Sequence, residues 1–189
     1  EEPDVLTSDV ALGDPAVLDL VREWSVGESV SVADVSVADA VSAQAASSPD
    51  ACALVFEGRN VSYGEFGARV SGLARELLAA GVGPDVAVGV CIDRSVEMVV
   101  AIHAVVAAGG QYVPFDTAAP ADRVAYMVDT AGVDLVLVAS GVVPDPVVAL
   151  GDSVRVVSVD ASGEVDLSVA VVSDVDRVRP ICGDDAIYT

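Results

Sequence analysis

The order of residue types between residues 94 and 127 constrains the fold of this chain more than any other stretch. Ser95 can begin a helix, an apolar run follows, and Gly109-Gly110 can end it. A short apolar strand comes next and stops at Pro114, because proline cannot donate to a strand ladder. Pro120 then opens a second helix. Helix, strand and helix with such tight connections are typical of a protein in which strands and helices alternate.

The same alternation extends over most of the chain after residue 50. Apolar runs bounded by turn residues predict further strands, at residues 52–57, at Val61, and at residues 86–92, 134–138 and 154–159. The run at 86–92 is continuously apolar, as expected for a strand covered on both faces. Strands separated by helices of about a dozen residues imply βαβ units. We therefore predict an α/β fold with a largely parallel sheet and flanking helices.

Ser62 and Glu65 mark the start of another predicted helix. They have capping-box spacing, so the Ser62 hydroxyl can accept from an early helix N–H while Glu65 reaches back to the cap. Apolar residues then recur at helical spacing until Gly81, which ends the helix. Residues 160–185 are acidic, show little periodicity and are predicted to form a loop.

The first fifty residues, 1–50, differ from the rest and are predicted to form an inter-domain linker with two amphipathic helices. The first helix covers residues 14–24, with Pro15 near its start. The second covers residues 35–46, with Ser36 as a candidate N-cap. Such a segment is expected to lie on something larger.

Charge and hydropathy exclude two classes of partner. Thirty acidic residues face nine arginines and no lysine, and the formal net charge is −21. Nucleic-acid binding needs a basic stripe, so the acidic balance instead predicts a solvated surface, with a docking surface for a basic partner as the alternative. The longest apolar run, residues 96–110, is shorter than the roughly 20 residues of a membrane span. No signal peptide is visible, and we expect a cytoplasmic protein.

Motifs for metal and phosphate binding are missing from the sequence. Cys52, Cys91 and Cys182 lie far apart without C-x-x-C spacing, and one histidine is present, so neither a zinc site nor a disulfide framework is predicted. Cys52 and Cys91 lie in apolar strand-like runs, where a buried reduced thiol is expected. Neither G-x-G-x-x-G nor G-x-x-x-x-G-K-[ST] occurs, and Gly81-Val82-Gly83 fits a helix exit.

Nucleophilic and acid–base catalysis have little support either. Ser140-Gly141 is not a G-x-S-x-G elbow, and one histidine cannot be matched to a Ser–acid pair. His103 lies mid-helix among apolar residues, which favours a packed core side chain over proton transfer. Asp184 and Asp185 could pair as carboxylates, but adjacent acids in an acidic loop are usually solvated.

Asp116 is the strongest remaining candidate, because it follows a strand where loops line the ligand crevice of open α/β sheets. We favour a simpler role, in which Asp116 caps a turn or the helix opening near Pro120. Arg123 could form a structural ion pair with Asp116 or Asp122 rather than a ligand clamp. We therefore assign no catalytic, cofactor-binding or metal-binding residue to this chain.

Taken together, these segments resemble the adenylate-forming (AMP-binding) superfamily, and within it the adenylation domains of nonribosomal peptide synthetases. Residues 51–140 carry the resemblance, in a combination more specific than any single piece. The family's elements appear here as VSYGEF at 61–66, GVGPDVAV at 81–88, RSVE at 94–97, VAAGGQYVPFD at 106–116, and Pro120, Arg123 and Tyr126 of a P-x-x-R-x-x-Y passage. Ala107 and Gln111 depart from the family, which usually has lysine and a small residue there.

The two ends of the chain extend the resemblance. Residues 1–50 look like the linker between a condensation and an adenylation domain, through the helix at 18–24 and Ser48-Pro49-Asp50-Ala51. DDAIYT at 184–189 resembles the strand that runs into the family's T-S-G-S-T-G-x-P-K-G phosphate loop. Residues 51–189 are thus expected to be the first part of the large N-terminal subdomain, truncated before the phosphate loop.

The resemblance implies a parent enzyme that activates an amino acid with ATP and Mg²⁺ to aminoacyl-AMP and loads it on a phosphopantetheine carrier. Implied partners are the rest of the adenylation domain, an upstream condensation domain, a downstream carrier domain and a small MbtH-like activator protein. The fragment itself is expected to be scaffold, inactive and unstable alone. The alternatives are a fragment of an acyl- or aryl-acid adenylating ligase, or a non-catalytic domain-interaction fragment.

Overall fold

A computed structural model of the protein describes residues 14–31 and 35–189. They fall into two compact units, which divide between residues 34 and 35. The first unit contains one described helix, α1 (Pro15–Ser25), as the sequence predicts. Asp14 caps it by accepting from the N–H of Ala16 at 2.9 Å. Its apolar residues are all exposed, Trp24 by 75%.

The centre of the second unit is a four-stranded parallel sheet. Its strands lie in the order β4 (Gln111–Pro114), β3 (Ala87–Cys91), β5 (Leu135–Ala139) and β6 (Arg155–Val159). Each β-strand predicted in this region is present to within two residues. The predicted α/β fold with a parallel sheet is confirmed.

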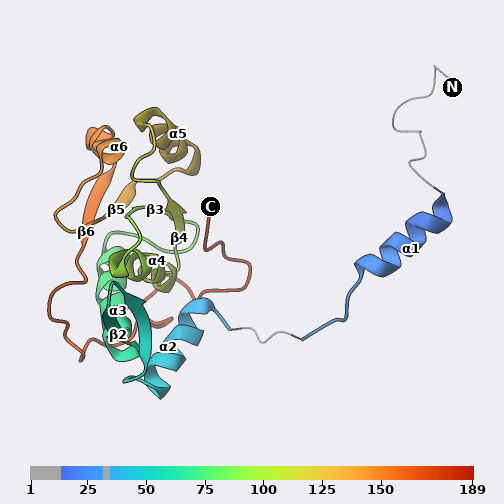
Figure 1. Ribbon diagram of the computed structural model, residues 1–189, viewed down its shortest axis with the longest axis horizontal. Helices are drawn as coiled ribbons and strands as arrows, with labels where there is room; N and C mark the ends of the chain where they lie inside the picture. Colours follow the sequence, from blue (N-terminus) through green and yellow to red (C-terminus); the bar gives the residue numbers. More distant parts are fainter. Residues whose placement is uncertain (1–13, 32–34) are drawn as a thin grey trace. The chain divides into compact units, whose positions relative to one another are not determined.

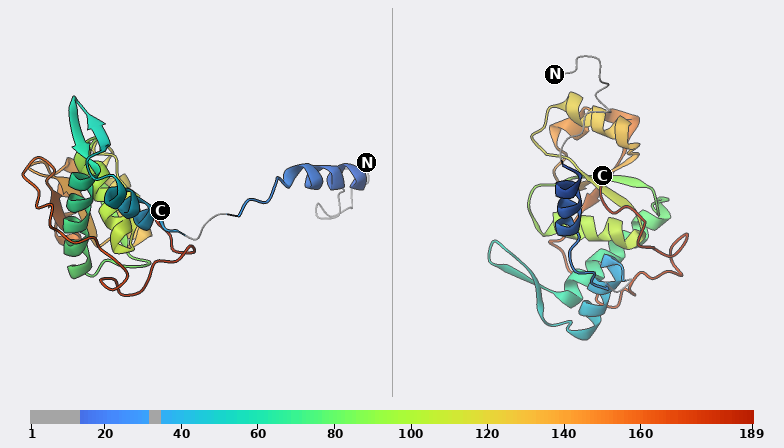
Figure 2. Two further views of the ribbon diagram at one scale, coloured as in Figure 1. Left: turned by 90° about the horizontal axis from the view of Figure 1, so that it is seen from below. Right: turned by 90° about the vertical axis from the view of Figure 1, so that its right-hand side faces the viewer.

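Helices cover both faces of this sheet (Figure 1, Figure 2). One face is covered by α3 (Tyr63–Ala79) and α4 (Val96–Ala108). The other face is covered by α5 (Ala121–Ala131) and the short α6 (Asp145–Val148). Side chains alternate across a strand, so Val88 and Val90 of β3 enter the first core while Ala87 and Cys91 enter the second. This two-sided burial explains why β3 is continuously apolar.

A second predicted helix, α2 (Val37–Ser47), belongs to the same unit as the sheet. Ser36 caps it, accepting from the N–H of Asp39 at 3.1 Å. The helix packs against α3 and α4, and its Ala38 is 7% exposed. α2 therefore contributes to the first core.

A β-hairpin leads into α3. Its strands are β1 (Cys52–Phe56) and β2 (Arg59–Ser62), paired antiparallel. Ser62 caps α3 as predicted, accepting from the N–H of Glu65 at 3.2 Å. The reciprocal half of the capping box is wrong, because the Glu65 carboxylate accepts instead from Arg59 and Arg69 at 2.9 Å. Two arginines outcompete one backbone N–H, since charge-assisted hydrogen bonds are the stronger ones.

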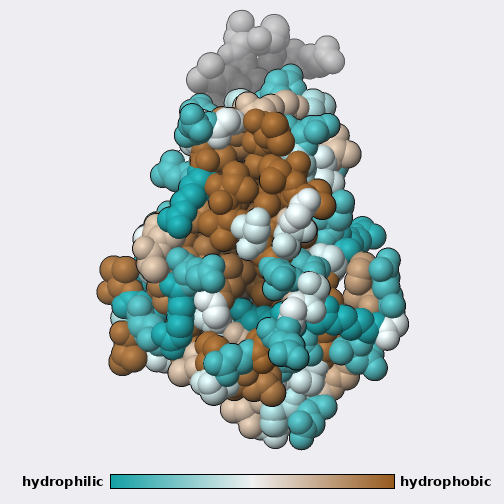
Figure 3. All heavy atoms as spheres, turned by 90° about the vertical axis from the view of Figure 1, so that its left-hand side faces the viewer, coloured by the Kyte–Doolittle hydropathy of each residue, from teal (hydrophilic) through white to brown (hydrophobic). Residues whose placement is uncertain are grey.

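The sequence patterns missed two short elements between β5 and β6. These are α6 and the 3₁₀ turn η2 (Gly151–Ser153), and both are too short to show a helical period. The face that carries α6 and the edge strand β6 is rich in apolar side chains (Figure 3), with Val148 62% and Val156 39% exposed. No helix in the described ranges is long and apolar enough to span a membrane.

Gly89 and Gly72 offer a matched test of packing around β3. A Cβ at Gly89 would lie 2.5 Å from Cε2 of buried Phe115 and 3.0 Å from Cγ2 of Val136, whereas one at Gly72 in α3 meets nothing within 4 Å. We expect Gly89→Ala to destabilise the sheet by about 1–3 kcal/mol through overpacking. Gly72→Ala should stabilise α3 by roughly 0.5–1 kcal/mol. Hydrogen exchange of the β3 and α3 amides in the full-length protein measures both changes in stability. The same change in exchange rate for the two variants would contradict the packing around Gly89.

Candidate functional site

The carboxyl edge of the parallel sheet holds the cleft where a ligand site is expected in this architecture. The cleft has a volume of about 460 Å³ and lies at the ends of β3 and β5. Its polar lining consists of Cys91, Asp93, Ser95, Glu97 and Thr117.

Hydrogen bonds already occupy most of these polar groups. Thr117 donates its hydroxyl to Asp93 Oδ1 at 2.6 Å, and Ser95 caps α4 by accepting from the N–H of Met98 at 3.2 Å. Asp116, on the adjoining loop, accepts from the N–H of Ala118 at 2.9 Å. Asp116 thus caps a turn, which confirms the structural role predicted for it.

Cys91 is the thiol of the cleft lining, and its environment keeps that thiol protonated. It is fully buried. Burial, with the negative charges of Asp93 and Asp116 adding to it, raises the pKa of the Cys91 thiol to about 11. The thiolate is the reactive form of cysteine, so Cys91 is not suited to act as a nucleophile at neutral pH.

The cleft does not suit phosphate groups, because its charged side chains are carboxylates. Arg123, the nearest sequence candidate for an anion clamp, is exposed. The predicted ion pair of Arg123 with Asp116 or Asp122 is also wrong: within the described chain Arg123 makes neither, and only its backbone N–H bonds Asp122, at 2.9 Å. The exposed guanidinium lies in solvent, where such a pair would gain little. The residues of this chain that line the cleft therefore do not by themselves fit the phosphates of ATP, although the carboxylates of Asp93 and Glu97 are of the type that binds Mg²⁺.

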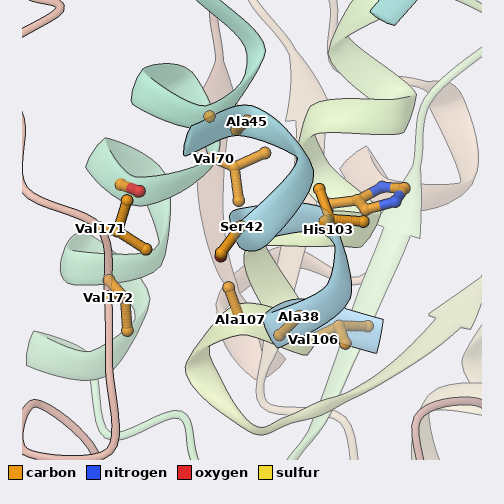
Figure 4. Close-up of a pocket in the computed structure, with 12 residues that line it drawn as sticks. Ala38, Ser42, Ala45, Val70, His103, Val106, Ala107, Val171 and Val172 are labelled. Carbon is orange, nitrogen blue, oxygen red and sulfur yellow. The ribbon is translucent and has the colours of Figure 1, made fainter. Parts of the chain in front are cut away.

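His103 lies beside a small cavity of about 30 Å³ between α2, α3 and α4 (Figure 4). Its Nδ1 is 2.9 Å from the carbonyl oxygen of Val99. Its ring meets Phe66 edge-on, with centroids 5.1 Å apart. The cavity lining is mainly alanine and valine, so His103 is the packed, hydrogen-bonded side chain that the sequence predicts.

The cysteine and aspartate predictions need two corrections. Cys52 is exposed, not buried, because β1 belongs to the two-stranded hairpin and not to the central sheet. Asp185 is not solvated either: its carboxylate is 7% exposed and pairs with Arg179 at 2.6 Å. Asp184 is exposed, as expected. Among residues 14–31 and 35–189, no three His, Cys, Asp or Glu side chains form a group that could hold a metal ion.

The last residues of the chain add a further strand segment to the sheet. Tyr188 forms a parallel bridge with Tyr112 of β4. The N–H of Tyr112 donates to the carbonyl of Ile187 at 3.0 Å, and the N–H of Thr189 donates to that of Tyr112 at 3.2 Å. The segment runs parallel to β4, towards the carboxyl edge where the cleft lies. This agrees with the strand character predicted for residues 184–189.

Comparison with known proteins decides the family. Residues 41–186, well over half of the chain, match the sequence profile described as AMP-binding enzyme. The chain belongs to the AMP-binding enzyme family. The match includes all of residues 51–140, which carry the resemblance, and ends just before the terminal segment that pairs with β4.

The similar proteins are large peptide synthetases. A linear gramicidin synthase of Brevibacillus parabrevis is 35% identical over 125 residues, which are 66% of this chain and 2% of the relative. Bacitracin synthase 1 of Bacillus licheniformis is 36% identical over 147 residues, 78% of this chain and 3% of the relative. The chain therefore spans only a few per cent of the length of these relatives.

A solved structure gives the same assignment. The AMPPNP-bound nonribosomal peptide synthetase FmoA3 superimposes with a TM-score of 0.71 at 28% identity, over 90% of this chain and 18% of that one. The chain is thus similar in fold and sequence to a piece of a synthetase.

The sequence patterns missed two arginines that hold the loop after β6. Arg177 and Arg179 lie in the stretch interpreted only as an acidic loop. Arg177 donates from Nε to the carbonyl of Ala107 at 2.8 Å, and Arg179 pairs with Asp185. The sequence did contain a signal for them: arginines within an otherwise acidic loop have aspartates nearby with which they can form ion pairs.

The three cysteines should differ in their reactivity. Cys52 and Cys182 are exposed, whereas Cys91 is buried and its thiol has a pKa raised to about 11. At pH 8 we expect iodoacetamide to modify Cys52 and Cys182 at least tenfold faster than Cys91, since thiolate fraction falls tenfold per pKa unit. The rate of Cys91 modification should increase only as the pH rises from 9 towards 11, because the folded protein keeps the thiol protonated up to its raised pKa, whereas the unfolded chain would already have lost the proton. Peptide mass spectrometry measures each site, and rapid Cys91 labelling at pH 8 would contradict its burial.

Proposed function

We propose that the chain is part of a nonribosomal peptide synthetase adenylation domain, which activates an amino acid with ATP to aminoacyl-AMP and pyrophosphate. The observation that carries this proposal is the match of residues 41–186 to the AMP-binding enzyme family. The relatives named above favour a synthetase over another adenylating enzyme.

The chemistry of the proposed reaction is an exchange at the α-phosphate. The substrate carboxylate attacks phosphorus, an acyl–phosphate bond forms, and the bond to pyrophosphate breaks. Such a reaction needs donors and Mg²⁺ that stabilise charge on the phosphates. The carboxyl-edge cleft of this chain is lined by carboxylates and, among the described residues, by no cationic side chain that could bind the phosphates, so this chain's role is to build the scaffold that positions other parts of the enzyme.

The proposed partners follow from the synthetase assignment. A condensation domain would precede the chain, the rest of the adenylation domain would follow it, and a carrier domain with a phosphopantetheine arm would receive the acyl group. A small MbtH-like activator is a further proposed partner, and the proposed location is the cytoplasm. Synthetases named among the relatives support a multidomain setting.

Pyrophosphate exchange tests the proposed function. We expect the full-length protein to incorporate labelled pyrophosphate into ATP when one amino acid is supplied, because aminoacyl-AMP formation is reversible. Aryl or fatty acids supplied in the same assay separate the second candidate, an acyl- or aryl-acid ligase. Exchange with neither class of acid would overturn the enzyme proposal and leave the non-catalytic alternative.

Residues 1–189 alone should show no amino-acid-dependent exchange. The physical reason is that the charged side chains lining the cleft, Asp93 and Glu97, are carboxylates, which repel a triphosphate. The same assay with the purified chain provides the measurement, and robust exchange by the chain would contradict the scaffold role.

We also propose the linker role for residues 1–50, with α2 as its docked end. α2 packs on α3 and α4, so protein whose chain begins at residue 51 should melt at a lower temperature than protein whose chain begins at residue 35. A loss of roughly 2–4 °C is expected for each kcal/mol of lost packing. Equal melting temperatures would show that α2 is dispensable for the fold.

A further inference from the structure

The loop between β6 and the terminal strand is held to the core by arginines. Arg69 donates from Nη2 to the carbonyl of Gly163 at 2.6 Å. Arg75 pairs with Asp176 at 3.0 Å and donates to the carbonyl of Ala170 at 3.1 Å. Both arginines come from α3, so the first half of the loop lies along this helix.

The next contact fixes the loop against the end of α4. The Arg177 side chain is 1% exposed and forms a 2.6 Å ion pair with Asp174. Its Nε donates to the carbonyl of Ala107 at 2.8 Å. A cation at a helix C-terminus is favourable, because the last carbonyls carry partial negative charge. Arg177 therefore anchors the loop next to the start of β4.

The two following residues contact the turn before β3. A Cβ on Gly83 would lie 3.7 Å from Cγ2 of Val178, so Val178 lies against that turn. Nη2 of Arg179 is 3.8 Å from the carboxylate of Asp85. Residues 177–179 are thus placed at the amino edge of the sheet.

Arg179 then closes a short turn on the chain itself. Its two terminal nitrogens donate to the two carboxylate oxygens of Asp185 at 2.6 and 2.8 Å, a bidentate geometry that fixes orientation as well as distance. The same carboxylate accepts from the N–H of Cys182 at 2.8 Å. These hydrogen bonds, from Arg179 first, hold the pKa of Asp185 well below its usual range.

The turn ends two residues before the terminal strand meets β4. Ile187 accepts from Tyr112, and Thr189 donates to Tyr112. The side chains meet as well, with the Tyr112 and Tyr188 ring centroids 5.3 Å apart. Thr189 also donates its hydroxyl to Gln111 Oε1 at 2.5 Å. The turn at Asp185 sets the point from which the chain reaches these partners on β4.

We propose that the Arg179–Asp185 ion pair is a positioning element that sets the register of the terminal strand, residues 187–189, on β4. The pair connects a fixed point, the turn before β3, to the residue from which the strand departs. Through that strand it positions whatever the chain carries to the carboxyl edge beyond Thr189. The consequence for ATP rests on the proposed function, because only the family resemblance places the phosphate loop there.

Hydrogen exchange of two amides in the full-length protein tests the proposal directly. The N–H groups of Tyr112 and Thr189 report the pairing of β4 with the terminal strand. We expect Arg179→Gln to speed their exchange roughly three- to tenfold, since a bidentate charged pair is lost at a partly exposed site. Arg179→Lys keeps the charge but not the fork, and should fall between wild type and Arg179→Gln.

Arg75→Ala is the matched control. It removes an arginine–aspartate pair from the same loop, at Asp176, without touching residues 177–189. It should loosen the amides near Asp176 and leave those of Tyr112 and Thr189 unchanged. Unchanged exchange in Arg179→Gln, or an equal effect of Arg75→Ala, would overturn the positioning role.

A kinetic measurement separates this inference from the proposed function. If the wild-type protein catalyses amino-acid-dependent exchange, Arg179→Gln should raise the KM for ATP roughly three- to tenfold and leave the KM for the amino acid unchanged, because misplaced groups lose binding and rate. An unchanged KM for ATP with a changed amide exchange would limit the ion pair to strand register and overturn its extension to ATP. A wild-type protein without exchange activity refutes the proposed function, while the amide measurement still decides on the ion pair.

Discussion

Two-sided burial of β3 is the constraint on which the rest of the second unit depends. Its five residues are all buried, and they alternate between the two cores. Gly89 lies in the middle with no room for a side chain beside Phe115. A strand with no exposed face must have helices on both sides, so α3 and α4 cannot be placed on the same face as α5 and α6. β4 and β5 pair with β3 in parallel, which brings the carboxyl ends of the strands to a common edge.

Local patterns were enough to predict this arrangement. Each strand and long helix has its own signal: continuous apolar runs for β3 and β5, serine caps for α2, α3 and α4, and a left-handed glycine at Gly109, with φ of 91°, that ends α4. These signals depend on residues within a few positions of one another. Such local signals therefore do not depend on how distant parts of the chain fold.

Side-chain pairing in the candidate site could not be predicted in the same way. Glu65 has capping-box spacing, yet Arg59 and Arg69 bind its carboxylate. Asp185 lies in an acidic stretch, yet Arg179, six positions earlier, pairs with it across a turn. Arg177 finds the carbonyl of Ala107, 70 positions away. Which acid an arginine selects depends on the folded path of the loop, and spacing in the sequence does not contain that path.

The distribution of arginines over the fold explains why no cationic side chain of the described residues lines the cleft. Six of the nine arginines form ion pairs in the described chain, and four of them hold the loop after β6 or its final turn. The cleft at the carboxyl edge receives none and keeps the carboxylates of Asp93 and Glu97. A protein with a net charge of −21 therefore uses four of its few cations to hold the loop that leads to the terminal strand. Under the proposed function, the groups that bind phosphate follow this strand, so the register of the strand is the point where structure would control chemistry.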